Sequence, residues 1–237
     1  PDPIVFPSIA VGGACSMAAL ARALARGGAA GGARLGATSA RFESAPPPDA
    51  DADLDKALKI AVNAKAKRPT VCNALDTILV HQNVAREFLP NLASEFGVHE
   101  IELRADGRAM SIMGALADGA KVVPAQSDDF GTEFLALIAS VKIVDSMDDA
   151  MEHIAEFGSK HSEAIISENT DSIERFLNEV DSGAVFANTS TYFNDGAQFG
   201  LGAEVAISTN KLHARGPMGL KEITTYKWKV RGQGQVR

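Results

Sequence analysis

Short apolar runs alternate with amphipathic helical patterns along most of this chain, and this alternation limits its possible folds more than any other feature. The apolar runs predict strands at residues 76–81, 98–103, 121–124, 141–145, 163–167 and 184–188. The spacing of apolar residues between them predicts helices at 52–66, 84–96, 147–157 and 170–180, the second interrupted or restarted at Pro90. Strands separated by helices are typical of a mainly parallel sheet, so we expect an α/β fold.

The composition is that of a protein with a real core and an acidic surface. Of the 237 residues, 46% are apolar and 22% charged, and the formal net charge is −7. This charge disfavours nucleic acid and anionic lipid as partners, because both are bound through clustered Lys and Arg. No run of 18 or more apolar residues occurs, so no membrane-spanning segment is predicted. We expect a cytoplasmic protein.

Composition changes sharply near residue 48. Residues 1–50 contain 14 Ala, 7 Gly, 6 Pro and four Arg but no Lys. The glycines of residues 25–36 match neither of the common phosphate-binding loops, so this stretch is interpreted as flexible and of low complexity. We expect residues 1–48 to be disordered or a foreign extension.

Cys72 is the first candidate for chemistry, because it lies in a turn between a predicted helix and a predicted strand. A thiolate attacks acyl carbons well, and backbone N–H groups at such a turn can hold the resulting oxyanion. The alternative is a buried, unreactive cysteine, which is the common state of this residue type and our interpretation of Cys15. The five histidines form no closely spaced pair, so no metal site is predicted.

Three later segments carry further signals. Glycines 196, 200 and 202 fall in FNDGAQFGLGAE, where the backbone either approaches a ligand or simply turns. Arg215 lies in KLHARGPMGL, a loop that suits a carboxylate or phosphate but equally suits a solvated turn. The alternating end of the chain, 221–232, predicts a strand that pairs with another subunit.

Long strings of sequence resemble one enzyme family. NAKAKRPTVCNALDTILVH (63–81), the stretch 178–220 and TTYKWKVRGQGQ (224–235) are similar to gamma-glutamyl phosphate reductase, a member of the aldehyde dehydrogenase superfamily, over about residues 50–237. The resemblance implies NADPH-dependent reduction of L-glutamyl 5-phosphate to L-glutamate 5-semialdehyde with release of phosphate, a step of proline biosynthesis. Cys72 falls on the catalytic cysteine of the family, which forms a thioacyl intermediate, and Asn73 flanks it.

The resemblance also implies roles for other residues. Glu133 and Phe134 correspond to a pair that touches the nicotinamide-side ribose of the cofactor. The segment that lines the substrate entrance corresponds to Asn188, Ser190, Thr191, Phe199 and Gly200, and Arg215 falls in a loop near the substrate. The C-terminal strand belongs to an oligomerisation element in the family, so a homodimer is expected.

These expectations divide the chain into a catalytic domain at 49–180, a segment at 181–214 that returns to the cofactor and substrate domain, and an oligomerisation tail at 215–237. Residues 1–48 do not resemble the Rossmann-type cofactor domain that precedes the catalytic domain in the family, so most of the cofactor site is expected to be missing. Two alternatives stay open: an inactive truncated remnant, or the reductase portion of a bifunctional kinase–reductase.

Overall fold

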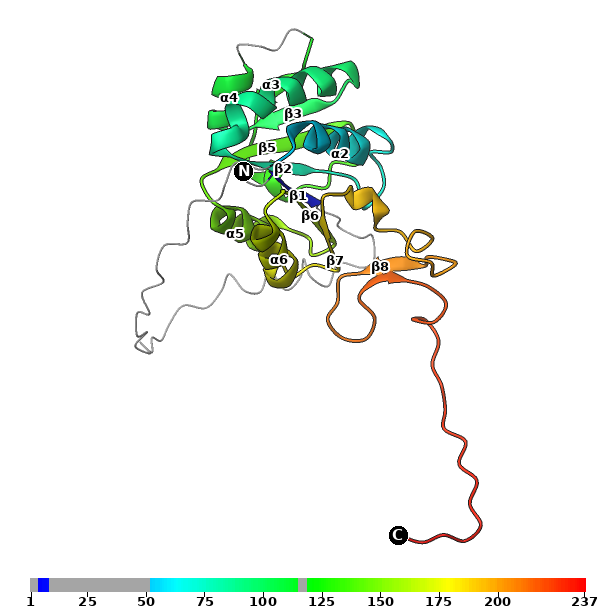
Figure 1. The fold of residues 1–237 in the computed structure, drawn as a ribbon. Helices are drawn as coiled ribbons and strands as arrows, with labels where there is room; N and C mark the ends of the chain where they lie inside the picture. Colours follow the sequence, from blue (N-terminus) through cyan, green and yellow to red (C-terminus); the bar gives the residue numbers. More distant parts are fainter. Residues whose placement is uncertain (1–3, 9–51, 115–118) are drawn as a thin grey trace, which may run out of the picture.

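One sheet organises the described part of the chain, which in the computed structural model comprises residues 4–8, 52–114 and 119–237 (Figure 1). Its strand order is β4-β3-β5-β2-β1-β6-β7. The bounds are β1 Ile4–Ser8, β2 Thr77–His81, β3 Glu102–Ala105, β4 Val122–Pro124, β5 Ile138–Val144, β6 Ser162–Ile166 and β7 Ala184–Ala187. Neighbouring strands are parallel except where β1 pairs antiparallel with β2 and β6. The predicted α/β fold with a mainly parallel sheet is confirmed.

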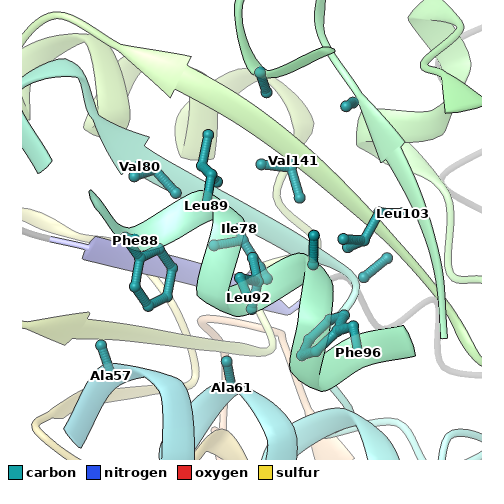
Figure 2. Close-up of a cluster of buried hydrophobic side chains, with 14 of the residues drawn as sticks. Ala57, Ala61, Ile78, Val80, Phe88, Leu89, Leu92, Phe96, Leu103 and Val141 are labelled. Carbon is teal, nitrogen blue, oxygen red and sulfur yellow. The ribbon is translucent and has the colours of Figure 1, made fainter. Parts of the chain in front are cut away.

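Helices cover both faces of this sheet. Helices α2 (Leu54–Ala66), α3 (Gln82–Val98) and α4 (Gly107–Met113) pack on one face, and α5 (Met147–Phe157) and α6 (Thr170–Glu179) pack on the other. Strand β2 therefore alternates between two hydrophobic clusters. Ile78 and Val80 point toward the α3 side chains in Figure 2, whereas Leu79 belongs to the cluster beneath α5 and α6.

Helix α2 ends where the chain must turn toward the sheet. Asp53 caps its start by accepting a hydrogen bond from the Lys56 amide at 2.9 Å. Its inner face is a stripe of small residues, Ala57, Ala61 and Ala64, all buried, which lets the helix approach the sheet closely. Pro69 follows the helix and disfavours its continuation. The turn after α2 carries Cys72.

Helix α3 differs from its prediction because it runs without a break through Pro90. The carbonyl that loses its partner belongs to the exposed Arg86, so water can satisfy it. The helix also extends to Val98, and a turn with Glu100 at φ 56° delays the next strand to Glu102 rather than residue 98. The sequence analysis missed helix α4, whose seven residues show too little periodicity to stand out.

The two ends of the chain depart from expectation in opposite directions. Residues 1–48 were predicted to be disordered or foreign, but Ile4–Ser8 form β1 between β2 and β6, where their backbone bonds to both neighbours. Residues 9–51 lie outside the described part of the chain. The strand predicted at 221–232 does not form: the chain there is extended, exposed and away from the sheet (Figure 1). No neighbouring strand within the described residues offers it backbone partners.

Candidate active site

The Cys72 turn is fixed to the structure on both sides. Within it the Ala74 amide donates to the Val71 carbonyl at 3.0 Å, and the Leu75 amide donates to the Ala64 carbonyl of α2, also at 3.0 Å. Strand β2 begins two residues later and is buried along its whole length. The turn thus holds its half-buried thiol on a rigid frame.

The surroundings of Cys72 favour the neutral thiol over the thiolate. Burial raises the pKa of the thiol, and the carboxylates of Glu204 and Glu133 raise the pKa further. Hydrogen bonds from the backbone amides of Cys72 and Asn73 to the sulfur lower the pKa but do not outweigh the other two causes. The resting group is therefore a thiol whose proton must be removed before it attacks a carbonyl.

Asn73 ties the Cys72 turn to the 3-10 helix η2 (Thr191–Phe193). Its side-chain Nδ2 donates to the carbonyls of Asn194 at 3.1 Å and Tyr192 at 3.3 Å. The Thr191 hydroxyl returns a hydrogen bond to the Asn73 carbonyl at 2.8 Å. Asn73 and Thr191 are both buried, so they act as fasteners between segments 118 residues apart, and Asn73 does not present its amide to solvent.

A cavity of about 660 Å³ lies beside this turn, between α2 and the segment 188–198. Val71 and Asn73 border it on the Cys72 side. Cations line the helix side, and polar and aromatic groups line the other: Lys56, Lys59, Asn63, Lys67 and Arg68 face Asn188, Ser190, Tyr192, Phe193, Asp195 and Gln198. Such a cavity suits a small anionic molecule.

Not every cation of this cavity is available to a ligand. Lys56 pairs with Glu168, and the Lys67 ammonium lies 4.5 Å from the centroid of the Tyr192 ring. Lys59 and Lys67 are exposed and lie eight residues apart, near one face of the helix. Asp195 is the acidic residue among those that line the cavity, so the net charge of its wall is positive.

Asn188 and Ser190, predicted at the substrate entrance, line the cavity but use their side chains elsewhere. The Asn188 amide is paired twice with the Ser167 backbone, accepting from its N–H at 3.0 Å and donating to its carbonyl at 2.8 Å. The buried Ser190 hydroxyl caps η2 by accepting from the Tyr192 amide at 3.2 Å. Both side chains thus shape the cavity wall.

Phe199 and Gly200, also predicted at the substrate entrance, are not among the residues that line the cavity. Phe199 is half exposed, with its ring 6.4 Å from that of Phe186 on β7. Gly200 has a φ of 74°, a conformation that favours glycine, so its conservative role is in the turn itself.

Glu133 and Phe134 come close to a buried ion pair. The Lys65 ammonium lies 3.0 Å from the Asp76 carboxylate, and the same carboxylate oxygen accepts from the Phe134 amide at 3.4 Å. The Phe134 ring stacks beneath the Arg104 guanidinium, 5.0 Å from the ring centroid. Because Glu133 acts electrostatically on both Lys65 and Cys72, these two predicted residues do lie near the turn.

Arg215 lies away from the cavity. Its guanidinium Nη1 lies 2.8 Å from Asp181, which also pairs with Lys211. Hydrogen bonds from Lys211 and then Arg215 lower the pKa of Asp181 to about 2. Asp181 precedes β7 and Asn188 follows it, so Arg215 sits at the other end of this strand from the cavity. The sequence pattern identified a basic loop but had no means of locating its acidic partner.

Three residues near the thiol were not singled out from the sequence. Glu204 falls inside a glycine-rich string whose glycines drew the attention, and its carboxylate accepts from the Gly196 amide at 2.7 Å. Lys65 lies on a helix among other lysines and Asp76 at a strand start, and both residue types are usually exposed. Only their position four residues on either side of the turn's core offered a hint.

Two searches gave negative findings for the part of the chain that the structure describes. No three His, Cys, Asp or Glu side chains there are grouped so that they could hold a metal ion. No helix there combines the length and apolar character that crossing a membrane requires.

Known proteins resemble this chain over most of its length. No protein-family model matches it. Gamma-glutamyl phosphate reductase of Dehalococcoides mccartyi is 58% identical over 189 residues, which is 80% of this chain but 44% of that protein. The crystal structure of gamma-glutamyl phosphate reductase from Thermotoga maritima aligns with a TM-score of 0.74 and 46% identity, covering 80% of this chain and 44% of that one.

A more distant structure shares the fold. An acetylating aldehyde dehydrogenase from Geobacillus thermoglucosidasius aligns with a TM-score of 0.56 at 17% identity over 79% of this chain. The resemblance to gamma-glutamyl phosphate reductase is confirmed, and the fold is of the aldehyde dehydrogenase type. The chain spans less than half the length of the relatives that it matches.

Proposed function

We propose that this chain, as a relative of part of gamma-glutamyl phosphate reductase, carries the catalytic thiol for reducing L-glutamyl 5-phosphate to L-glutamate 5-semialdehyde. The observation that carries this proposal is the placement of Cys72 in a fastened turn that borders a cation-lined cavity. An acyl phosphate with a carboxylate at its far end is a small anion of the kind that this cavity suits. The step belongs to proline biosynthesis and takes place in the cytoplasm.

In the proposed mechanism, Cys72 attacks the acyl carbon after losing its proton. Glu133 and Glu204 are the candidate acceptors, because their carboxylates are close enough to raise the pKa of the thiol. The sulfur bonds to the acyl carbon, the carbonyl oxygen becomes an oxyanion, and collapse expels phosphate to leave a thioester. The amides of Cys72 and Asn73, which face the sulfur, are the candidate donors to that oxyanion.

The proposed cofactor is NADPH, which supplies the hydride that reduces the thioester. The described residues fit it in part. Glu133 and Phe134 lie near the thiol, as groups that meet the nicotinamide-side ribose should. No glycine-rich loop leads from a strand into a helix among the described residues, so the adenosine and phosphates find no evident site there. The remainder of the cofactor site is expected on residues that this chain lacks.

The cavity is proposed to bind the amino-acid end of the substrate. Lys59, Lys67 and Arg68 supply positive charge for the α-carboxylate, and Asp195 supplies a carboxylate for the α-ammonium group. Asn188, Ser190 and Thr191 keep the opposite wall in place. The exposed Tyr226, Trp228 and Val230 of the C-terminal tail are the proposed contacts with a second copy in a homodimer.

The activity is tested in the direction that oxidises the aldehyde. The chain is mixed with glutamate semialdehyde, phosphate and NADP⁺, and the absorbance of the reduced cofactor is followed. We expect Cys72→Ser to abolish any turnover, since a serine hydroxyl at this position has no comparable acidity, whereas Cys15→Ser retains it. Turnover that survives in Cys72→Ser refutes the proposed nucleophile.

An inactive remnant is the competing proposal, favoured by the chain covering 44% of its relatives. If the chain shows no turnover, rapid labelling of Cys72 by a thiol reagent and restoration of turnover by the missing part of a relative support the reductase. Absence of both supports the remnant. The reductase portion of a bifunctional kinase–reductase predicts the same chemistry at Cys72.

A further inference from the structure

Lys65 is the largest side chain that this structure buries completely, with 0% exposure. Its ammonium lies on the last turn of α2 and pairs with Asp76, whose side chain is 3% exposed. Burial lowers the pKa of Lys65 and raises that of Asp76, so each charge depends on its neighbours. Replacing a buried ion pair by apolar residues is often neutral or stabilising, so this pair is poorly explained by stability.

The pair joins three segments that meet at the thiol. Asp76 lies four residues after Cys72, at the start of β2, and its backbone carbonyl accepts from the Ser140 amide of β5 at 2.8 Å. Its carboxylate accepts from the Phe134 amide. The Lys65 ammonium lies 5.9 Å from the centroid of the Phe134 ring. The helix, the Cys72 turn and the Glu133–Phe134 segment are thus held together around one ammonium group.

The charges that face the thiol are unbalanced without this ammonium. Glu204 approaches from the loop after η2, and Glu133 approaches from the loop before β5. Lys65 attracts both Asp76 and Glu133, which raises the pKa of Lys65 against the effect of burial. Lys65 is therefore the buried cation that opposes the Glu133 charge on the thiol side.

We propose that Lys65 is a positioning residue for Cys72: anchored on Asp76, its ammonium holds the Glu133–Phe134 segment against the Cys72 turn and balances the Glu133 carboxylate beside the thiol. This inference rests on the proposed role of Cys72 as the nucleophile. Removing Lys65 leaves the Glu133 charge uncompensated, which makes the thiolate harder to form. Asp76 adds no charge of its own in that case, because burial already favours its protonated form.

The test measures the thiol directly and needs neither cofactor nor turnover. Iodoacetamide alkylation of Cys72 is followed between pH 6 and 10 in a Cys15→Ala background, because the reagent reacts with thiolates. We expect Lys65→Met to move the alkylation profile to higher pH and to slow the reaction about threefold at pH 7.5, equivalent to roughly half a pKa unit. Glu133→Gln should move the profile the other way.

The double variant Lys65→Met/Glu133→Gln distinguishes positioning through Glu133 from a general structural role. We expect it to behave like Glu133→Gln alone, because no carboxylate is then left for Lys65 to balance. If the slowing caused by Lys65→Met persists in full in the Glu133→Gln background, the inference is wrong. An unchanged profile in folded Lys65→Met also overturns it.

Lys65→Met alone leaves Asp76 buried without its partner, so that variant is checked by circular dichroism. If it does not fold, Lys65→Met/Asp76→Asn decides, since it removes both charges while leaving Glu133 in place. The slower alkylation should persist in this pair variant, and a parental profile there refutes the inference. Failure of the activity assay affects only the proposed function, because alkylation reports the thiol itself.

Discussion

The fastening of the Cys72 turn by Asn73 leads to a stability prediction whose size follows from its hydrogen bonds. Asn73→Ala removes the donor to the fully buried Asn194 residue and the longer bond to the Tyr192 carbonyl. Each hydrogen bond contributes about 1 kcal/mol, and a buried acceptor left without a donor costs about 1–3 kcal/mol. The substitution also removes the Asn73 Oδ1 atom, which is buried without a partner and already costs stability. We therefore expect a net loss of about 2 kcal/mol.

The loss is measured by urea unfolding followed by far-UV circular dichroism, because the single tryptophan, Trp228, is 84% exposed and reports little on the core. Asn73→Asp tests the direction of the bonds: it keeps the shape but points an acceptor at two carbonyls, so it should destabilise more than alanine does. Asn91→Ala is the matched control, since its amide bonds to Glu87 on the exposed face of α3. A change below about 0.5 kcal/mol in Asn73→Ala, equal to the control, would refute the fastening role.

Two further predictions concern acid sensitivity and backbone conformation. Burial, and for His153 the nearby Lys142, lowers the pKa of His153 and His161 to about 4, so the unfolded chain binds their protons first and stability should fall between about pH 6.5 and 4, by roughly 3 kcal/mol per histidine; urea unfolding at pH 7 and 4.5 should show a smaller drop for His153→Phe, and an equal drop would contradict this. Gly216→Ala should destabilise by about 1–3 kcal/mol because Gly216 has a φ of 80° and an added Cβ would meet a backbone oxygen at 3.0 Å, whereas Gly107→Ala at the open start of α4 should be neutral or stabilising in thermal melts.

The sequence predicted the fold well where burial patterns are strong. The helices at 52–66, 147–157 and 170–180 and the strands near 76–81 and 163–167 lie within a few residues of their predicted bounds. Their apolar runs are bounded by capping residues such as Asp53, which mark helix starts in the sequence. Pro90 misled the prediction because a proline breaks helices on average, while this one leaves its orphaned carbonyl facing water.

The candidate site could be predicted only as far as local strings allow. Cys72 and Asn73 were found because the turn that carries them is contiguous in the sequence. Glu204 and Lys65 were missed because their relation to the thiol arises from packing between distant segments, which no local pattern encodes. Arg215 was placed wrongly for the same reason, since its partner Asp181 is 34 residues away.

The complete burial of β2 on both faces leaves its alignment along the sheet underdetermined by hydrophobicity. Sliding the strand by one position exchanges the sides of Ile78, Leu79 and Val80, yet every one of them remains an aliphatic side chain in an aliphatic cluster. The same slide moves Asp76 by about 3.3 Å, away from Lys65, and strands two charges in the interior. The buried ion pair thus acts as a ratchet stop: it makes the slipped arrangement costly and fixes where along the sheet Cys72 comes to rest.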